Sequence, residues 1–308
     1  MPAQFPSSAT DYRALAARRL PRFLFDYVDG GAGAERTLAA NLDDFAALRL
    51  RQRVLRDVDG VDTRCVIAGE DCAMPLALAP IGLAGMMARR GEAQAARVAE
   101  QAGVPFTLST VGICPLAEVQ AARRTPFWFQ LYMLRDRGVV AALLDEAWAT
   151  GCRTLVFTVD LPLPGLRHRD VRNGLEARGA AGAMLRLRQV LARPRWLREV
   201  AVGGRPLRFG CLTAQVPDAR NLDAFKAWVD TQFDPSVTWR DIEWLRARWK
   251  GRLLLKGILD VEDARAAVQI GADGIVVSNH GGRQLDSVAS SISLLPAIAQ
   301  AVGERTEV

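Results

Sequence analysis

A histidine and an arginine stand three residues apart in the segment Ser278-Asn-His-Gly-Gly-Arg283, and this histidine is one of only two in the chain. An imidazole exchanges a proton near neutral pH, and a guanidinium binds a carboxylate through two parallel hydrogen bonds. The pair Gly281-Gly282 permits backbone angles and close approaches that other residues resist. His280 and Arg283 therefore suggest proton abstraction from a small acidic substrate. The alternative is a surface loop whose histidine caps a helix, and the rest of the chain must decide between the two.

Other polar side chains stand at the ends of short apolar segments. Buried strands are predicted at 76–79, 106–109, 127–132, 154–160, 253–256 and 274–278. Apart from one long gap after Asp160, these segments start roughly 20 to 30 residues apart with amphipathic helices between them, which is the spacing of βα units and a parallel sheet. Active sites of α/β barrels lie at the C-terminal ends of such strands. The polar residues expected there are Ser109, Gln130, Tyr132, Thr158, Asp160, Lys256 and His280.

Two of these residues carry charges that a buried strand must compensate. Lys256 follows Leu253-Leu-Leu255, and a buried ammonium without a partner is costly. The partner is either a carboxylate or an electron-rich cofactor. Asp160 could accept the second imidazole N–H of His280, which would orient the ring and stabilise the imidazolium. Arg167 is a second candidate for binding a substrate carboxylate, with a salt bridge inside its loop as the alternative.

The same pattern predicts the domain organisation. Residues 1–60 are expected to form an N-terminal helical segment, and residues 61–308 an α/β domain of the TIM (β/α)8-barrel type. A closed barrel of this kind has eight strands. Because about six are expected here, the barrel is predicted to be incomplete at its C-terminal end. A basic insertion at about 170–240 is expected to follow the fourth strand.

The positive charge of the chain is concentrated in this insertion. The net charge is +6, yet eleven arginines stand against three carboxylates between 167 and 208. Arginines alternate there with apolar residues, a basic amphipathic pattern that suits an anionic membrane surface better than nucleic acid. A solvated arginine-rich loop is the alternative. The cluster comprises Arg186, Arg188, Arg193, Arg195 and Arg198 among Met184, Leu185, Leu187, Val190, Leu191, Trp196 and Leu197.

Composition excludes several other classes of protein. The longest uncharged apolar stretch, 72–88, contains two prolines and two glycines, so no transmembrane helix is predicted. The N-terminus lacks the pattern of a signal peptide. Five scattered cysteines without a C-x-x-C pair indicate reduced thiols in the cytoplasm and no metal site.

Longer motifs connect these candidates to a known family. They are Phe25-Asp-Tyr27, Asp29-Gly-Gly-Ala32, Ala79-Pro80, Leu108-Ser-Thr110, Trp128-Phe-Gln-Leu-Tyr132, Phe157-Thr-Val-Asp160, Lys256-Gly257 and Ser278-Asn-His-Gly-Gly-Arg-Gln-Leu-Asp286. With them the chain resembles, essentially end to end, the FMN-dependent L-2-hydroxy-acid dehydrogenases and oxidases, the family of glycolate oxidase and L-lactate dehydrogenase. Met86-Met-Ala-Arg-Arg-Gly91 and Phe106-Thr-Leu-Ser-Thr-Val111 most resemble the bacterial membrane-associated L-lactate dehydrogenases.

The resemblance implies a role for each matching residue. His280 would be the base that takes a proton from lactate, and Asp160 would stabilise its charged form. The substrate would be bound by Tyr27, Tyr132, Arg167 and Arg283. The FMN would be contacted by Ala79, Pro80, Ser109, Gln130, Thr158, Lys256 and Ser278. The implied reaction is oxidation of L-lactate to pyruvate, with electrons passed to a quinone or cytochrome by an enzyme held peripherally on the cytoplasmic side of the inner membrane.

Three alternatives remain. In the family, the FMN phosphate is bound by the last two βα units, which are expected to lie beyond residue 308, so a flavin-poor, non-catalytic remnant that persists as a binding partner is the second hypothesis. Mandelate and glycolate are the alternative substrates. Members of the family often form homo-oligomers, which the sequence itself does not indicate.

Overall fold

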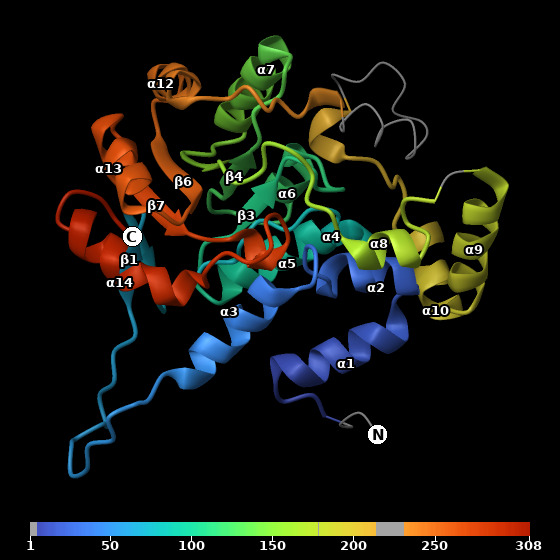
Figure 1. The fold of residues 1–308 in the computed structure, drawn as a ribbon, viewed down its shortest axis with the longest axis horizontal. Helices are drawn as coiled ribbons and strands as arrows, with labels where there is room; N and C mark the ends of the chain where they lie inside the picture. The colour runs from blue at the N-terminus through green and yellow to red at the C-terminus, as the bar shows by residue number, and fades with distance from the viewer. Residues whose placement is uncertain (1–4, 178, 214–230) are drawn as a thin grey trace.

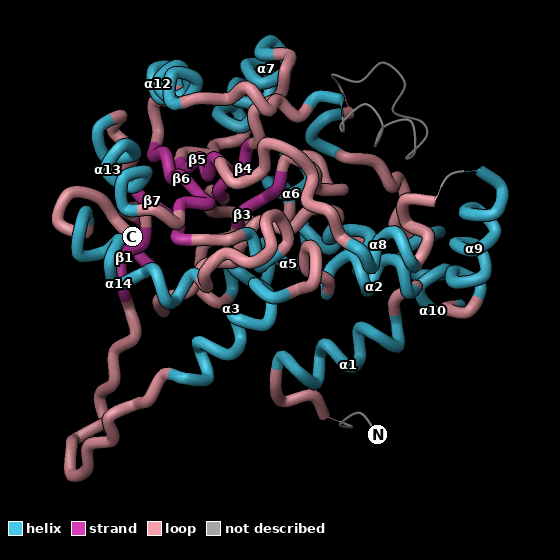
Figure 2. Tube along the Cα trace, viewed as in Figure 1, coloured by secondary structure: helices cyan, strands magenta, loops and turns pink. Residues whose placement is uncertain are grey.

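A parallel sheet of five strands lies at the centre of the protein (Figure 2). The computed structural model describes residues 5–177, 179–213 and 231–308. The strands are β3 (Thr107–Ser109), β4 (Trp128–Leu131), β5 (Thr154–Thr158), β6 (Arg252–Ile258) and β7 (Gly274–Val277), and they pair in the order of the chain. Residues of β3, β4 and β5 are buried without exception, because helices cover a parallel sheet of this kind. The predicted α/β barrel architecture is confirmed.

The first predicted strand, 76–79, is reduced to a single bridge between Leu78 and Phe106. Leu78 donates its N–H to Pro105 and accepts from Thr107. Pro75 and Pro80 flank this segment and lack the N–H groups that would extend the ladder. Five strands and one bridge therefore replace the six strands expected.

Helices pack around the sheet in the order of the chain (Figure 1). Ala264, Ala267 and Ile298 are examples of the small and aliphatic side chains that they bury in one continuous core. The helices of this layer are α4 (Ala84–Met87), α5 (Gly91–Gln101), α6 (Leu116–Ala121), α7 (Arg137–Ala149), α12 (Trp239–Arg248), α13 (Val261–Gln269) and α14 (Ser291–Val302).

A hairpin that the sequence did not suggest covers the N-terminal end of the sheet. Its strands are β1 (Cys65–Ile67) and β2 (Glu70–Cys72), joined by Ala68 and Gly69, both at positive φ. Glu70 accepts hydrogen bonds from the Trp128 indole at 2.7 Å and the Thr154 hydroxyl at 3.4 Å. The predicted site residues stand at the opposite, C-terminal end of the sheet, where active sites of α/β barrels lie.

Three N-terminal helices precede the hairpin: α1 (Ala9–Arg19), α2 (Arg22–Asp29) and α3 (Arg36–Ala47). The α2 helix begins after Pro21 and ends at Gly30. It buries Phe23 and Leu24 against a second, smaller core cluster. This contact brings the end of α2 beside the C-terminal ends of the strands.

The segment between β5 and β6 contains α8 (His168–Arg172), α9 (Gly179–Leu191), α10 (Pro194–Trp196), a π-helix at Leu197–Val202 and a 3-10 turn at Gly210–Leu212. Figure 1 shows α9 and α10 at one edge of the molecule, beside α2. Trp196 is buried in the second core cluster and donates to the Met86 carbonyl at 2.8 Å. The interpretation of Trp196 as part of an exposed amphipathic face was wrong, because its indole is a core side chain.

Candidate active site

His280 and Asp160, which are 120 residues apart in the chain, meet at the C-terminal end of the sheet. His280 Nδ1 lies 2.7 Å from Asp160 Oδ1, and the two side chains are only 20% and 12% exposed. Because Nδ1 faces a carboxylate, it carries the proton, and Nε2 is left as the acceptor. Burial lowers the pKa of His280, although the hydrogen bond that its Nδ1–H donates to Asp160 opposes this effect. The ring is therefore neutral at neutral pH and can accept a proton.

The turn that carries His280 is in a left-handed conformation. His280, Gly281 and Gly282 have φ values of 60°, 67° and 71°. The Asn279 side chain accepts from the Gly282 N–H at 3.0 Å and donates to Asn41 on α3 at 2.8 Å. A Cβ on Gly282 would lie 2.6 Å from the Leu38 backbone nitrogen. The positive φ of a histidine is a strained conformation, of the kind that functional sites retain when the surrounding structure holds it.

A glycine on the neighbouring strand makes room for the partner of His280. Gly257 has a φ of 115°, and a Cβ there would lie 2.6 Å from Asp160 Cβ. The register between β6 and β7 shifts at this residue. Lys256-Gly257 is one of the motifs that carry the resemblance, but nothing in the sequence around Gly257 indicates that this glycine adjoins Asp160.

Two arginines lie over one aromatic ring. The guanidinium carbons of Arg283 and Arg167 lie 5.0 Å and 5.5 Å from the ring centroid of Tyr27. Arg167 is held by Asp170 at 2.8 Å. Arg283 donates only to the backbone carbonyls of Gly30 at 2.7 Å and Val28 at 3.3 Å, and it forms no ion pair with any described residue. Burial lowers the pKa of Arg283.

Tyr132 belongs to the same neighbourhood. Burial raises the pKa of its phenol, and the next contributions come from Tyr27 and Asp160. The ring packs edge-on against Phe233 with centroids 5.5 Å apart. The phenol is therefore protonated at neutral pH and can donate a hydrogen bond.

A chain of hydrogen bonds connects three adjacent strands. The Ser109 hydroxyl donates to Gln130 Oε1 at 3.0 Å, and Gln130 Nε2 donates to the Thr158 hydroxyl at 3.0 Å. All three side chains are buried. The sequence predicted these residues at strand ends, and the parallel register aligns Ser109 with Gln130 and Thr158 with Lys256.

The Lys256 ammonium has no hydrogen-bond or ion-pair partner among the described residues, while its backbone carbonyl accepts from the Val159 N–H at 2.9 Å. Burial lowers its pKa, with only the more distant charge of Asp160 opposing the shift. The sequence analysis left two alternative partners for Lys256, a carboxylate and an electron-rich cofactor, and the structure bears on the first of them. No carboxylate of the described chain forms an ion pair with Lys256.

The last three predicted residues lie near this cluster. The Ser278 hydroxyl accepts from the His280 N–H at 3.0 Å. Ala79 and Pro80 follow the Leu78 bridge, and a Cβ on nearby Gly82 would lie 2.8 Å from Val111 and 3.5 Å from the Tyr27 hydroxyl. Ala79 is exposed and Pro80 half-buried. The structure thus gives Ala79 and Pro80 a place at the strand ends, with no hydrogen bond between them and the other predicted residues.

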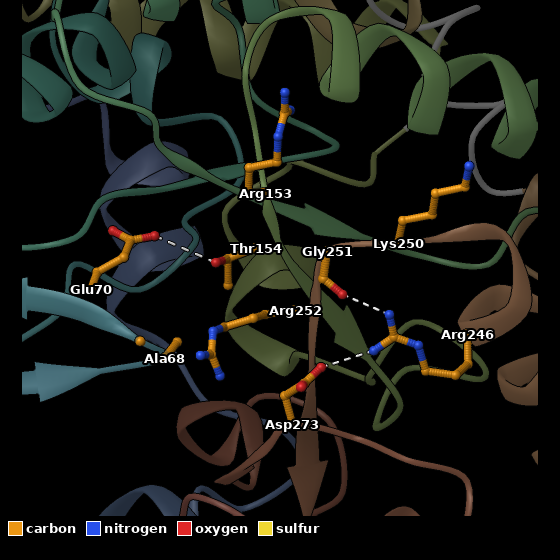
Figure 3. A pocket seen from close by; sticks show the side chains of 10 residues that line it. Ala68, Glu70, Arg153, Thr154, Arg246, Lys250, Gly251, Arg252 and Asp273 are labelled. Carbon is orange, nitrogen blue, oxygen red and sulfur yellow. Dashed lines mark hydrogen bonds and ion pairs between the residues drawn. The ribbon is translucent and has the colours of Figure 1, made fainter.

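A cavity of about 590 Å³ lies at the other end of the sheet, against the hairpin (Figure 3). Its charged residues partly satisfy one another, as in the 2.8 Å pair of Arg246 with Asp273. Arg153 and Lys250 point away from Arg252 in Figure 3, so the cations do not converge on one ligand. The cluster around His280 is the candidate active site, because it combines a base, an orienting carboxylate and unpaired cations.

Comparison with known proteins agrees with this geometry. Residues 16–308 match the model of the FMN-dependent dehydrogenase family. An L-lactate dehydrogenase of Caulobacter vibrioides (strain NA1000 / CB15N) is 57% identical over 302 residues, which cover 98% of this chain and 78% of the relative. An L-lactate dehydrogenase of Alcaligenes faecalis is 53% identical over 296 residues, 96% of this chain and 78% of the relative.

Solved structures give the same result. A monotopic membrane protein, (S)-mandelate dehydrogenase, matches with a TM-score of 0.90 at 33% identity, over 97% of this chain and 79% of its own. A mandelate oxidase matches with a TM-score of 0.79 at 37% identity, over 99% and 78%. The fold and site define an α/β-barrel oxidoreductase. The chain belongs to the family of FMN-dependent dehydrogenases.

The residues present fit an isoalloxazine ring. Such a ring needs hydrogen-bond donors and acceptors along its polar edge and a positive charge that stabilises its reduced form. Ser109, Gln130 and Thr158 are side chains that could supply the former, and the unpaired ammonium of Lys256 is a group that could supply the latter.

Proposed function

We propose that this protein oxidises L-lactate to pyruvate with FMN as its cofactor and passes the electrons to a quinone or cytochrome of the respiratory chain. The observation that carries the proposal is the 2.7 Å pair of His280 and Asp160 beside two guanidinium groups. The relatives above 50% identity, which carry the name L-lactate dehydrogenase, support lactate over other 2-hydroxy acids.

The substrate carboxylate would bind between Arg283 and Arg167. Arg283 is a half-buried cation without a carboxylate partner in the described chain, and an ionised substrate would supply the missing charge. Arg167 donates through Nε to Asp170 and keeps its terminal nitrogens for the ligand. The hydroxyls of Tyr27 and Tyr132 would bind the remaining substrate oxygens.

Proton abstraction would fall to His280. Its neutral ring keeps Nε2 free to accept a proton, while the Nδ1–H is held by Asp160. When the ring becomes charged, the carboxylate stabilises it. Overall, L-lactate loses two electrons and two protons and becomes pyruvate.

The residues that would hold FMN are Ala79, Pro80, Ser109, Gln130, Thr158, Lys256 and Ser278. When bound, the flavin would take up the two electrons from the substrate. Lys256 would stabilise the negative charge of the reduced ring, since its ammonium is half-buried and unpaired within the described residues.

Peripheral membrane association on the cytoplasmic side of the inner membrane is the second part of the proposal. No helix of the described chain is long and apolar enough to cross a bilayer. On α9, Met184, Leu187 and Leu191 are exposed, next to the outward-facing Arg188 and Arg195. A helix with this composition can lie in the plane of an anionic interface, and the monotopic mandelate dehydrogenase supports this arrangement.

The test is the visible spectrum of the chain with FMN before and after anaerobic addition of L-lactate. Bleaching of bound flavin is the expected result, and the ratio kcat/KM for L-lactate should exceed that for (S)-mandelate and glycolate. Mandelate is the second candidate because of the TM-score of 0.90. A protein that binds FMN but bleaches only with mandelate would overturn the assignment of substrate, and one that binds no FMN would favour the non-catalytic alternative.

A further inference from the structure

The carboxylate of Asp286 caps a helix from a distant part of the chain. Its Oδ2 accepts from the Ala34 N–H at 2.8 Å and its Oδ1 from the Thr37 N–H at 2.9 Å, across 252 and 249 residues of sequence. The α3 helix begins at Arg36, and Glu35 before it gives the helix no side-chain cap within the described chain. Backbone N–H groups, that of Thr37 above all, lower the pKa of the Asp286 carboxyl. The carboxylate is therefore ionised at neutral pH and stabilises the positive end of the helix.

The close approach of Asp286 to α3 requires a glycine. Gly33 has a φ of 54°, and a Cβ there would lie 2.8 Å from Asp286 Oδ2. Thr37, whose side chain is fully buried, adds a second link, because its hydroxyl donates to the Val288 carbonyl at 3.1 Å and accepts from the Val288 N–H at 3.0 Å. Four hydrogen bonds therefore hold the start of α3 to the segment that follows the His280 turn.

The loop between α2 and α3 also contains the anchor of Arg283. The Gly30 carbonyl accepts from the Arg283 guanidinium at 2.7 Å. Two residues further on, the Ala32 N–H donates to the Gly282 carbonyl at 2.8 Å, immediately before Arg283 in the chain. The position of the guanidinium therefore depends on a loop whose other end is held by Asp286.

The base of the candidate site is held by other contacts. The His280 ring is fixed by Asp160 at 2.7 Å, and its backbone N–H donates to the Ser278 hydroxyl at 3.0 Å. Neither contact involves the loop between α2 and α3. Loss of the Asp286 carboxylate should therefore displace Arg283 more than His280.

We infer that Asp286 is a positioning residue for substrate binding: by capping α3 it fixes the loop between α2 and α3, and through the Gly30 carbonyl it sets the position of Arg283. This inference rests on the proposed function, in which Arg283 binds the carboxylate of lactate. It separates substrate affinity, which depends on Asp286, from proton abstraction by His280, which does not.

The experiment compares the FMN-loaded chain with Asp286→Ala and with the control Asp260→Ala. Asp260 caps α13 by accepting from the N–H groups of Glu262 at 2.7 Å and Asp263 at 3.4 Å, so the control loses a cap of the same kind on another helix. In Asp286→Ala, the KM for L-lactate and the calorimetric Kd for pyruvate should rise about 5- to 50-fold while kcat falls less than about threefold, because a small displacement of a substrate-binding group weakens its contact. Both variants should unfold at similarly lowered temperatures, and only Asp286→Ala should lose affinity for the ligands.

The conservative variant Asp286→Asn gives a graded readout. Its amide keeps one acceptor oxygen for the two N–H groups, so its KM should lie between those of the unsubstituted chain and Asp286→Ala. If Asp286→Ala does not fold, the same comparison with the control is made with Asp286→Asn.

Hydrogen exchange provides a readout that does not depend on turnover. Backbone amides in 30–37 and 280–288 should exchange faster in the Asp286 variants than in the unsubstituted chain and the control. Unchanged exchange, unchanged KM and Kd, an equal loss of affinity in the control, or a fall in kcat at constant KM would overturn the inference. Flavin that fails to bleach in the unsubstituted chain would instead overturn the proposed function, and hydrogen exchange would still test the cap.

Discussion

Replacing Asp160 by asparagine tests the proposed mechanism most directly. The substitution keeps the size of the side chain and leaves a carbonyl oxygen to accept the Nδ1–H of His280 at the present 2.7 Å. It removes the negative charge that would stabilise the imidazolium. A hydrogen bond to a charged group contributes about 1.5–3 kcal/mol, so the rate of flavin bleaching by L-lactate should fall about 10- to 150-fold.

The same substitution should also shift the pH dependence of flavin bleaching in a defined direction. The Asp160 carboxylate raises the pKa of His280 against the lowering effect of burial. Without that charge, the pKa of His280 falls further, and the neutral ring persists to lower pH. The acid limb of the rate profile should therefore move to lower pH in Asp160→Asn.

Stopped-flow bleaching under anaerobic conditions measures both quantities. Asp145→Asn is the matched control, because that carboxylate is 71% exposed on α7 and should leave rate and profile unchanged. A variant that bleaches at the original rate, or whose acid limb moves to higher pH, would refute the role given to Asp160.

Three further predictions follow from the same contacts. Arg283→Lys should raise the KM for L-lactate about 10- to 100-fold in steady-state assays, because an ammonium cannot make the bidentate contact of a guanidinium. Lys256→Met should lower the reduction potential of bound FMN by about 30–60 mV in a spectroelectrochemical titration, while the apoprotein unfolds at an equal or higher temperature because a half-buried ammonium without a carboxylate partner in the described chain is lost. Replacing Met184, Leu187 and Leu191 together by serine should move the protein from anionic vesicles to the supernatant in a sedimentation assay without changing bleaching by L-lactate.

The membrane prediction uses point substitutions and not a deletion, because the arginine-rich segment also contributes to the core of the protein. Deleting the whole arginine-rich segment would remove Trp196 from the second core cluster and Gln189 from its two backbone contacts. A protein without this segment would leave the membrane fraction if it no longer folded, whatever the role of the segment at the membrane. Serine at three exposed positions removes apolar area alone.

Local sequence patterns predicted most of the sheet and the strand-end residues. Runs such as Leu253-Leu-Leu255 reveal a buried strand, and parallel pairing then places Lys256 beside Thr158. The pairing of His280 with Asp160 was also accessible, since each ends a strand of the same sheet. These features depend on the alternation of apolar runs with helical segments and on the parallel pairing of strand ends, and both follow from local sequence patterns.

Contacts between distant loops could not be predicted in this way. Asn41 and Asn279 are 238 residues apart and hold the turn of His280 through two hydrogen bonds. Nothing in the neighbourhood of either asparagine specifies the other. The burial of Trp196 could not be predicted either, because its neighbours in the sequence have the pattern of a surface helix and its core contacts come from distant segments. The strand Glu70-Asp-Cys72 of the hairpin is short and polar, so it lacks the pattern of a strand.

The candidate site concentrates features that would destabilise a protein designed for stability alone. His280 holds a left-handed conformation, Lys256 and Arg283 are cations without carboxylate partners, and Asp160 Oδ2 and Gln284 Oε1 are buried without a hydrogen-bond partner in the described chain. Other buried atoms without a partner in the described chain, such as Glu92 Oε2 and Arg123 Nε, lie elsewhere, so the combination of unpaired cations with a strained base is what marks the site. An anionic substrate and an electron-rich flavin would provide the partners that these cations lack. Strain and unpaired charge persist at sites where a bound ligand compensates for them. The concentration of these unfavourable features around His280 therefore favours ligand binding there.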